Sequence, residues 1–217
     1  MPMSQRSLRP VDASSLILYR GRGASLEILV GLRGANHVFV PNRVVYPGGR
    51  VDSTDARIKP AAPLRADVAA RLGRTASEAR ARALAVAAVR ELFEETGLLL
   101  AAGDDVPDRW HPEIAPRLDT MDYIFRAVTP PGRSRRFNTR FFLAAADHVR
   151  GELGGDGELE NLGWLGIDAL RDLPLMWITR TVLDEAQRLI DSPPPPDPDR
   201  PIPVSLPRRE PGKLRFE

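Results

Sequence analysis

Residues 90–98 read Arg-Glu-Leu-Phe-Glu-Glu-Thr-Gly-Leu, and they hold three glutamates within five positions. On a helix, with about 100° between successive residues, Glu91, Glu94 and Glu95 fall on one arc. That arc lies beside an apolar stripe that contains Leu92. Like charges at this spacing weaken a helix and raise one another's pKa unless a positive group lies among them. A hard divalent cation such as Mg²⁺, which takes oxygen ligands, would supply that positive charge.

A solvated helix face is the alternative interpretation, because most acidic clusters are exposed. The apolar flank and the following Leu98-Leu99-Leu100 place the acids beside a core, which favours the metal site. Arg90 lies one turn before Glu94 and is expected to orient it through an i, i+4 pair. Gly97 is expected to take the left-handed conformation that ends a helix.

The start of this helix is predicted from Thr75-Ala76-Ser77-Glu78. This sequence has the pattern of a capping box, with Thr75 as the N-cap residue and Glu78 at the third helical position. The pattern predicts one long helix from Ala76 to Thr96.

Residues 90–98 resemble the second half of the Nudix box, and Tyr46-Pro47-Gly48-Gly49 resembles the Pro-Gly-Gly turn at which that box begins. The resemblance implies a Nudix hydrolase with an α/β/α sandwich and a mixed sheet. It implies an enzyme that uses Mg²⁺ or Mn²⁺ to cleave the diphosphate linkage of a nucleoside diphosphate derivative. A catalytically silent Nudix fold that acts as a ligand sensor or interaction module is the alternative, but it has no need of all three acids.

The spacing within the box departs from the family. Arg90 follows Gly49 by 41 residues, far more than is usual, so residues 53–74 form an insertion. Segments of this size are either lids and binding loops or disordered, and both interpretations stay open. The box glutamate that normally lies between the two halves has no clean match. Counting forward from the glycine reaches Asp55, counting back from the arginine reaches Arg82, and neither is assigned.

Residues 136–142, Arg-Phe-Asn-Thr-Arg-Phe-Phe, resemble a strand in the Nudix branch related to the peroxisomal coenzyme A diphosphatases. That branch also tends to carry a long insertion inside the box. Its upstream signature keeps its spacing when its first arginine is aligned on Arg33, although several identities are lost. The resemblance implies coenzyme A or an acyl derivative as substrate.

The candidate site residues fall into three groups. Catalytic roles are expected for Glu91, Glu94, Arg90 and Glu158; substrate binding for Arg33, Arg50, Arg136 and Arg140; metal binding for Gly49, Glu91, Glu94, Glu95 and Glu160. Glu158 and Glu160 share one face of a predicted strand, for which an ordinary exposed face is the alternative. Arg136 and Arg140 also share a strand face, where their charges could instead protect a sheet edge.

The remaining pattern predicts a mixed α/β sandwich. Strands are expected at 14–20, 26–33, 43–46, 121–128, 136–145 and 158–165, with helices at 64–72 and 178–190. At 217 residues and 42% hydrophobic content, the chain suits one well-buried domain, predicted over 1–191. Residues 192–217 are expected to form a Pro-rich tail.

Cysteine content, net charge and apolar run length limit the kinds of partner that the chain is expected to bind. The chain has no cysteine, which excludes disulfides and fits a reducing cytoplasm. A net charge of +2 gives no general attraction for nucleic acid, and no apolar run has the length of a membrane span. The expected partner is a small diphosphate substrate, and the resemblance also implies a possible homodimer.

Overall fold

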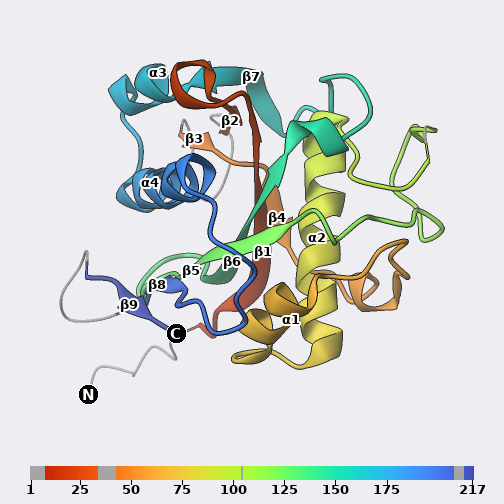
Figure 1. The fold of residues 1–217 in the computed structure, drawn as a ribbon, viewed down its shortest axis with the longest axis horizontal. Coiled ribbons are helices and arrows are strands. Elements are labelled where there is room, and N and C mark those ends of the chain that lie inside the picture. Colours follow the sequence, from red (N-terminus) through yellow and green to blue (C-terminus); the bar gives the residue numbers. More distant parts are fainter. Residues whose placement is uncertain (1–7, 34–42, 104, 208–212) are drawn as a thin grey trace.

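The structure is a computed structural model that describes residues 8–33, 43–103, 105–207 and 213–217. Within these residues, one mixed sheet lies between α2 on one side and α3 and α4 on the other (Figure 1). The strands are β1 (Val11–Arg20), β2 (Glu27–Arg33), β3 (Val44–Val45), β4 (Gly48–Arg50), β5 (Asp122–Val128), β6 (Phe137–Ala145), β7 (Leu159–Gly166), β8 (Pro203–Ser205) and β9 (Arg215–Phe216). The helices are α1 (Ala66–Gly73), α2 (Glu78–Thr96), α3 (Ile167–Asp172) and α4 (Trp177–Asp191), with short 3₁₀ turns η1 (Gly23–Ser25), η2 (Asp55–Arg57) and η3 (Ala146–His148). The predicted mixed sandwich is confirmed. No helix of the described segments is long and apolar enough to cross a membrane.

The sheet is organised around β1. Its strand order is β3-β2-β1-β6-β5-β8-β9, with β4 paired to β1 and β7 paired to β2. β1 runs parallel to β6 and antiparallel to β2 and β4. The pairing with β4 sets Gly49 opposite Ser14 and Gly48 opposite Ser15. This register holds the Pro-Gly-Gly turn next to α2, which contacts both β1 and β4.

Alternation along β1 divides the core into two layers. Leu16 and Leu18 point to the layer beneath α2, where they join Leu84 and other buried residues of that helix. Ile17 points to the opposite layer, where it packs with Val182 and other residues of α4. Each face of the sheet is therefore sealed by one long helix.

The C-terminal end of α2 was predicted correctly from the sequence, and its N-terminal end was not. Its C-terminal end is as predicted, because Gly97 has a φ of 75° and its N–H donates to the Phe93 carbonyl. The predicted capping box is wrong: Ser77 is the N-cap residue, and its side chain accepts from the Arg80 N–H at 3.3 Å. The Thr75 N–H donates instead to the Leu72 carbonyl at the end of α1, so it is not the donor that a capping box with Glu78 requires.

The insertion is an ordered part of the domain. Its side chains Ile58, Val68 and Leu72 are buried in the core layer beneath α2. The fully buried Arg71 of α1 donates to the Asp122 carboxylate at 2.8 Å and to the Tyr123 carbonyl at 3.0 Å. The short helix expected in this segment is confirmed as α1, and the segment is anchored to both α2 and β5.

Residues 192–217 were predicted to follow the domain as a tail, but part of them completes the sheet. β8 runs parallel to β5, with Val204 opposite Arg126, and β9 pairs with β8 (Figure 1). Ile202 and Val204 are buried. The predicted boundary at 191/192 therefore separates β8 and β9 from the sheet in which they pair.

Candidate active site

Arg90 lies at the centre of the site, although it is only 6% exposed. Its Nε and Nη2 donate to the two carboxylate oxygens of Asp55 at 2.9 and 3.1 Å, and Nη2 also donates to the Arg50 carbonyl at 2.9 Å. A planar guanidinium is suited to such a two-point contact. Asp55 is fully buried in η2 and also accepts from the Asp52 N–H at 2.7 Å. Of the two residues that counting along the sequence left unassigned, Asp55 therefore meets Arg90, whereas Arg82 donates to the Ala56 carbonyl.

The other edge of Arg90 faces the acids of its own helix. Nη1 donates to Glu91 Oε1 and to Glu94 Oε2, both at 2.8 Å, which confirms the predicted i, i+4 pair. Burial alone would lower the pKa of Arg90, but hydrogen bonding to Asp55 and the charges of Asp55, Glu91 and Glu94 raise it. Arg90 is thus a permanently charged clamp that fixes two glutamates and the start of the insertion together.

Glu91 is the buried member of the acid cluster, the name used here for Glu91, Glu94 and Glu95. A Cβ added at Gly49 would overlap the Glu91 carboxylate, so only glycine allows β4 and this side chain to approach so closely. Burial raises the pKa of Glu91 to about 7; the charges of Glu94 and Glu158 act in the same direction, and Arg90 opposes them. At this carboxylate the cost of burial therefore outweighs the salt bridge from Arg90.

Glu95 anchors the Pro-Gly-Gly turn. It is 2% exposed, and its Oε2 accepts from the Gly48 N–H at 2.8 Å. A Cβ at Gly48 would meet the backbone of Ser14 and Ser15, so the turn packs tightly between β1 and α2. In this structure Glu95 positions the backbone that borders Glu91.

Of the two acids predicted to share a strand face, Glu158 lies near the acid cluster, at the end of the segment before β7. The Asp156 N–H donates to the Glu94 carbonyl at 3.0 Å, and the Gly154 N–H donates to the Thr96 carbonyl at 2.9 Å. Glu158 follows in this segment, is exposed, and acts electrostatically on Glu91. Glu160 lies on β7 opposite Leu32 and is exposed.

Two of the four arginines expected to bind substrate have structural partners instead. Arg140 is 2% exposed, and its Nη1 donates to Asp12 Oδ1 at 2.7 Å. Arg136 donates to the carbonyls of Thr129 at 3.0 Å and Leu8 at 2.6 Å. In this structure the two guanidiniums join β6, an internal strand of the sheet, to β1 and to the segments next to β1 and β5.

The other two arginines remain candidates. Arg50 has an exposed side chain at the end of β4, and its carbonyl accepts from Arg90. Arg33 ends β2, and its side chain lies outside what the structure describes.

The donor chemistry of the acid cluster fits a hard divalent cation. Carboxylate oxygens and a backbone carbonyl at the glycine turn are the ligands that Mg²⁺ and Mn²⁺ accept. A cation would lower the raised pKa of Glu91, and the glycine cradle leaves its carboxylate accessible from β4. In the described ranges, no three His, Cys, Asp or Glu side chains already converge on one point as ligands.

The fold and the site can now be compared with known proteins. A NUDIX hydrolase from Alicyclobacillus acidocaldarius is similar in structure, with a TM-score of 0.63 and 28% sequence identity, over 85% of this chain and 96% of that one. The chain has the fold of a Nudix hydrolase. The E. coli ORF135 protein shares the fold alone, with a TM-score of 0.50 and 16% identity over 86% of this chain and 95% of that one.

Sequence comparison also finds a relative that is named as a Nudix hydrolase. The Caenorhabditis elegans protein named "Putative nudix hydrolase 7" is 28% identical over an alignment of 155 residues, and the match covers 63% of this chain and 44% of that protein. The chain thus spans less than half of that relative's length. No family model matches the chain. The relatives in sequence and in structure support a Nudix hydrolase.

Proposed function

We propose that this Nudix hydrolase cleaves the diphosphate linkage of a nucleoside diphosphate derivative in the presence of Mg²⁺ or Mn²⁺. The observation that carries the proposal is the buried Glu91 carboxylate, which lies against Gly49 with a raised pKa and is fixed by Arg90. A buried acid with too little compensating positive charge is costly unless a ligand makes use of it.

The roles follow from where each group lies. Glu91, Glu94 and the backbone at Gly49 would hold the cation, whose charge would neutralise the diphosphate and favour attack by water. Arg90 holds both glutamates in place through Nη1. Glu95 fixes the glycine turn by accepting from the Gly48 N–H.

Glu158 is the proposed proton acceptor. It is exposed, and its charge acts on Glu91, so it lies beside the acid cluster with access to water. A carboxylate in this position can take the proton of an attacking water, while that water displaces one phosphoryl group in line. Arg50, whose side chain is exposed, is the proposed ligand of a phosphate oxygen of the substrate.

We propose coenzyme A or an acyl derivative as the first substrate to test. The support is the long insertion and the kept spacing between Arg33 and Gly49. Arg136 and Arg140 no longer contribute to this support as binding residues, because their guanidiniums have internal partners.

The test is turnover of a substrate panel with Mg²⁺ and with Mn²⁺, with products identified by mass spectrometry. The panel should contain coenzyme A, an acyl derivative, ADP-ribose and a dinucleoside polyphosphate. Metal-dependent cleavage of a diphosphate bond supports the proposed reaction, and the relative rates decide the substrate. An absence of turnover across the panel would favour the ligand-sensor alternative.

A further inference from the structure

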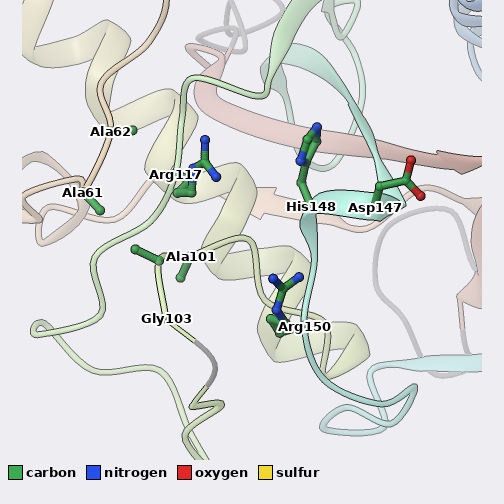
Figure 2. Close-up of a pocket in the computed structure, with 9 residues that line it drawn as sticks. Ala61, Ala62, Ala101, Gly103, Arg117, Asp147, His148 and Arg150 are labelled. Carbon is green, nitrogen blue, oxygen red and sulfur yellow. The ribbon is translucent and has the colours of Figure 1, made fainter.

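A cavity of about 430 Å³ shares no lining residue with the acid cluster. Its walls are alanines and a glycine, with charged side chains at its border: Ala61, Ala62, Ala101, Ala102, Gly103, Arg117, Asp147, His148 and Arg150. Arg117, His148 and Arg150 surround one central opening, while the Asp147 carboxylate points away from the other three (Figure 2). Because two of these three side chains are arginines, the site is called the arginine cavity here.

The backbone around the arginine cavity is a small network of paired segments. Arg117 pairs with Ala62 of the insertion, and its N–H donates to the Leu100 carbonyl at 3.0 Å. Arg150 exchanges backbone hydrogen bonds with Leu99 at 2.8 and 2.9 Å. Residues 99–101 therefore lie between the two arginine segments. Backbone hydrogen bonds therefore hold the Arg117 and Arg150 segments near each other, although the two positions are 33 apart in the sequence.

The charges that face the cavity favour an anion. Asp119 occupies Nε and Nη2 of Arg117 at 3.1 and 2.6 Å, which leaves Nη1 available on an oriented guanidinium. The charge and hydrogen bond of Arg117 in turn lower the pKa of Asp119. Arg150 donates from Nη1 to the Val149 carbonyl at 3.2 Å, makes a further interaction, and brings a second guanidinium to the border of the cavity. His148 adds an imidazole that can donate a hydrogen bond.

We propose that the arginine cavity binds a phosphate-class anion, such as a phosphate monoester or pyrophosphate. Guanidiniums on separate segments match the several oxygens of such a group, and its volume is within the range of small-ligand pockets. The alanine and glycine walls leave room for a compact polar ligand and offer no apolar side chain of any size to hold a large apolar one. This binding does not depend on the catalytic activity proposed above.

A binding titration on the metal-free protein tests the proposal directly. Without metal the acid cluster repels anions, so pyrophosphate has little reason to bind there. The chain has three histidines, which makes the imidazole ¹H–¹⁵N spectrum simple to assign through a His148→Gln variant. The expected result is a saturable shift of the His148 signals on titration with pyrophosphate.

Two matched double variants complete the design. Arg117→Gln/Arg150→Gln should weaken pyrophosphate binding by about tenfold or more, since it removes both charge-assisted donors. Arg133→Gln/Arg135→Gln removes the same charge from the exposed β5–β6 turn and should leave affinity within roughly twofold. Arg150→Gln alone keeps the Arg117–Asp119 pair and should show a smaller loss. Equal affinity in wild type and the Arg117/Arg150 variant overturns the proposal, as does the absence of a saturable shift up to about 10 mM.

Turnover measurements then separate two sources of the anion. The loop from Arg150 to Glu158 joins the arginine cavity to the acid cluster, so the anion could be a second phosphate of the substrate or a free effector. If the Arg117/Arg150 variant raises KM only for a substrate that carries a further phosphomonoester, the substrate supplies the anion. If KM is unchanged and inorganic phosphate alters turnover only with the arginines present, a free anion is bound. A protein that shows binding but no turnover would refute the proposed reaction and leave this site standing.

Discussion

Replacement of Asp55 by asparagine isolates the contact that joins the insertion to the acid cluster. Asp55 is fully buried and accepts from Arg90 at 2.9 and 3.1 Å. Asp55→Asn keeps the size of the side chain but removes the charge facing a guanidinium that is itself only 6% exposed. Removal of one partner of a buried ion pair typically costs about 3–5 kcal/mol. Because Glu91 and Glu94 still face Arg90, we expect about 3 kcal/mol, the lower end of that range.

The assay is urea unfolding of metal-free protein at pH 7, with a thermal melt in parallel. A loss of about 3 kcal/mol should lower Tm by about 6–12 °C in a chain of this size. The matched control is Asp52→Asn, in the same segment, where the exposed side chain is changed and the N–H that donates to Asp55 is kept. The reasoning fails if Asp55→Asn unfolds within about 1 kcal/mol of wild type, or if Asp52→Asn costs as much.

Three further changes probe the site and the sheet. The pKa of Glu91 is raised in the folded protein to about 7, so its stabilising contribution is present below about pH 4.5 and is lost as pH rises through 7. The difference in unfolding free energy between wild type and Glu91→Gln, measured without metal at pH 4.5 and pH 8, should therefore change by about 3 kcal/mol; a pH-independent difference would contradict the burial argument. Gly49→Ala places a methyl group on the Glu91 carboxylate and should lower metal-dependent kcat by at least about tenfold. The control is Gly73→Ala at the end of α1, a glycine without a positive φ and with open space in its Cβ direction, which should leave kcat within roughly twofold. Ile202→Ala should destabilise the protein by about 2–4 kcal/mol in urea unfolding, since Ile202 is 1% exposed, and a neutral result would mean that residues after 191 are not part of the core.

The features that depend on local spacing could be predicted from the sequence. The acid arc, the Arg90–Glu94 pair and the Gly97 cap all lie within one helix, where a period of about 3.6 residues determines neighbours. The strands of the central sheet were likewise visible from short apolar runs. The fold class followed from their order.

The errors arose where distant segments determine the structure. Asp55 could not be chosen over Arg82 because the insertion hides how the chain returns to α2. Thr75 resembled an N-cap, but the end of α1 engages its N–H. Arg140 had the pattern of a strand-face arginine, and its partner Asp12 lies 128 residues away in the sequence. Such pairings depend on tertiary context and not on propensity.

The β8 and β9 strands illustrate the same limit. They are three and two residues long and follow a Pro-rich stretch, so no period can be read from them. β8 becomes a strand because β5 offers it a parallel edge next to buried positions for Ile202 and Val204. The six-residue step from Gly49 to Asp55 was the one signal in the sequence that could have identified the missing carboxylate.

The measurement that tests the central claim most directly is Mg²⁺-dependent turnover by Glu94→Gln. Glu94 is oriented by Arg90 at 2.8 Å, and glutamine keeps its size and helix propensity while removing the charge a hard cation needs. Glu78→Gln, at the first position of the same helix, is the control and should change stability slightly and turnover little. The account predicts a loss of turnover of at least about a hundredfold for Glu94→Gln, with the metal-free protein as stable as wild type or more so. Near-normal metal-dependent turnover by Glu94→Gln would place the active site elsewhere.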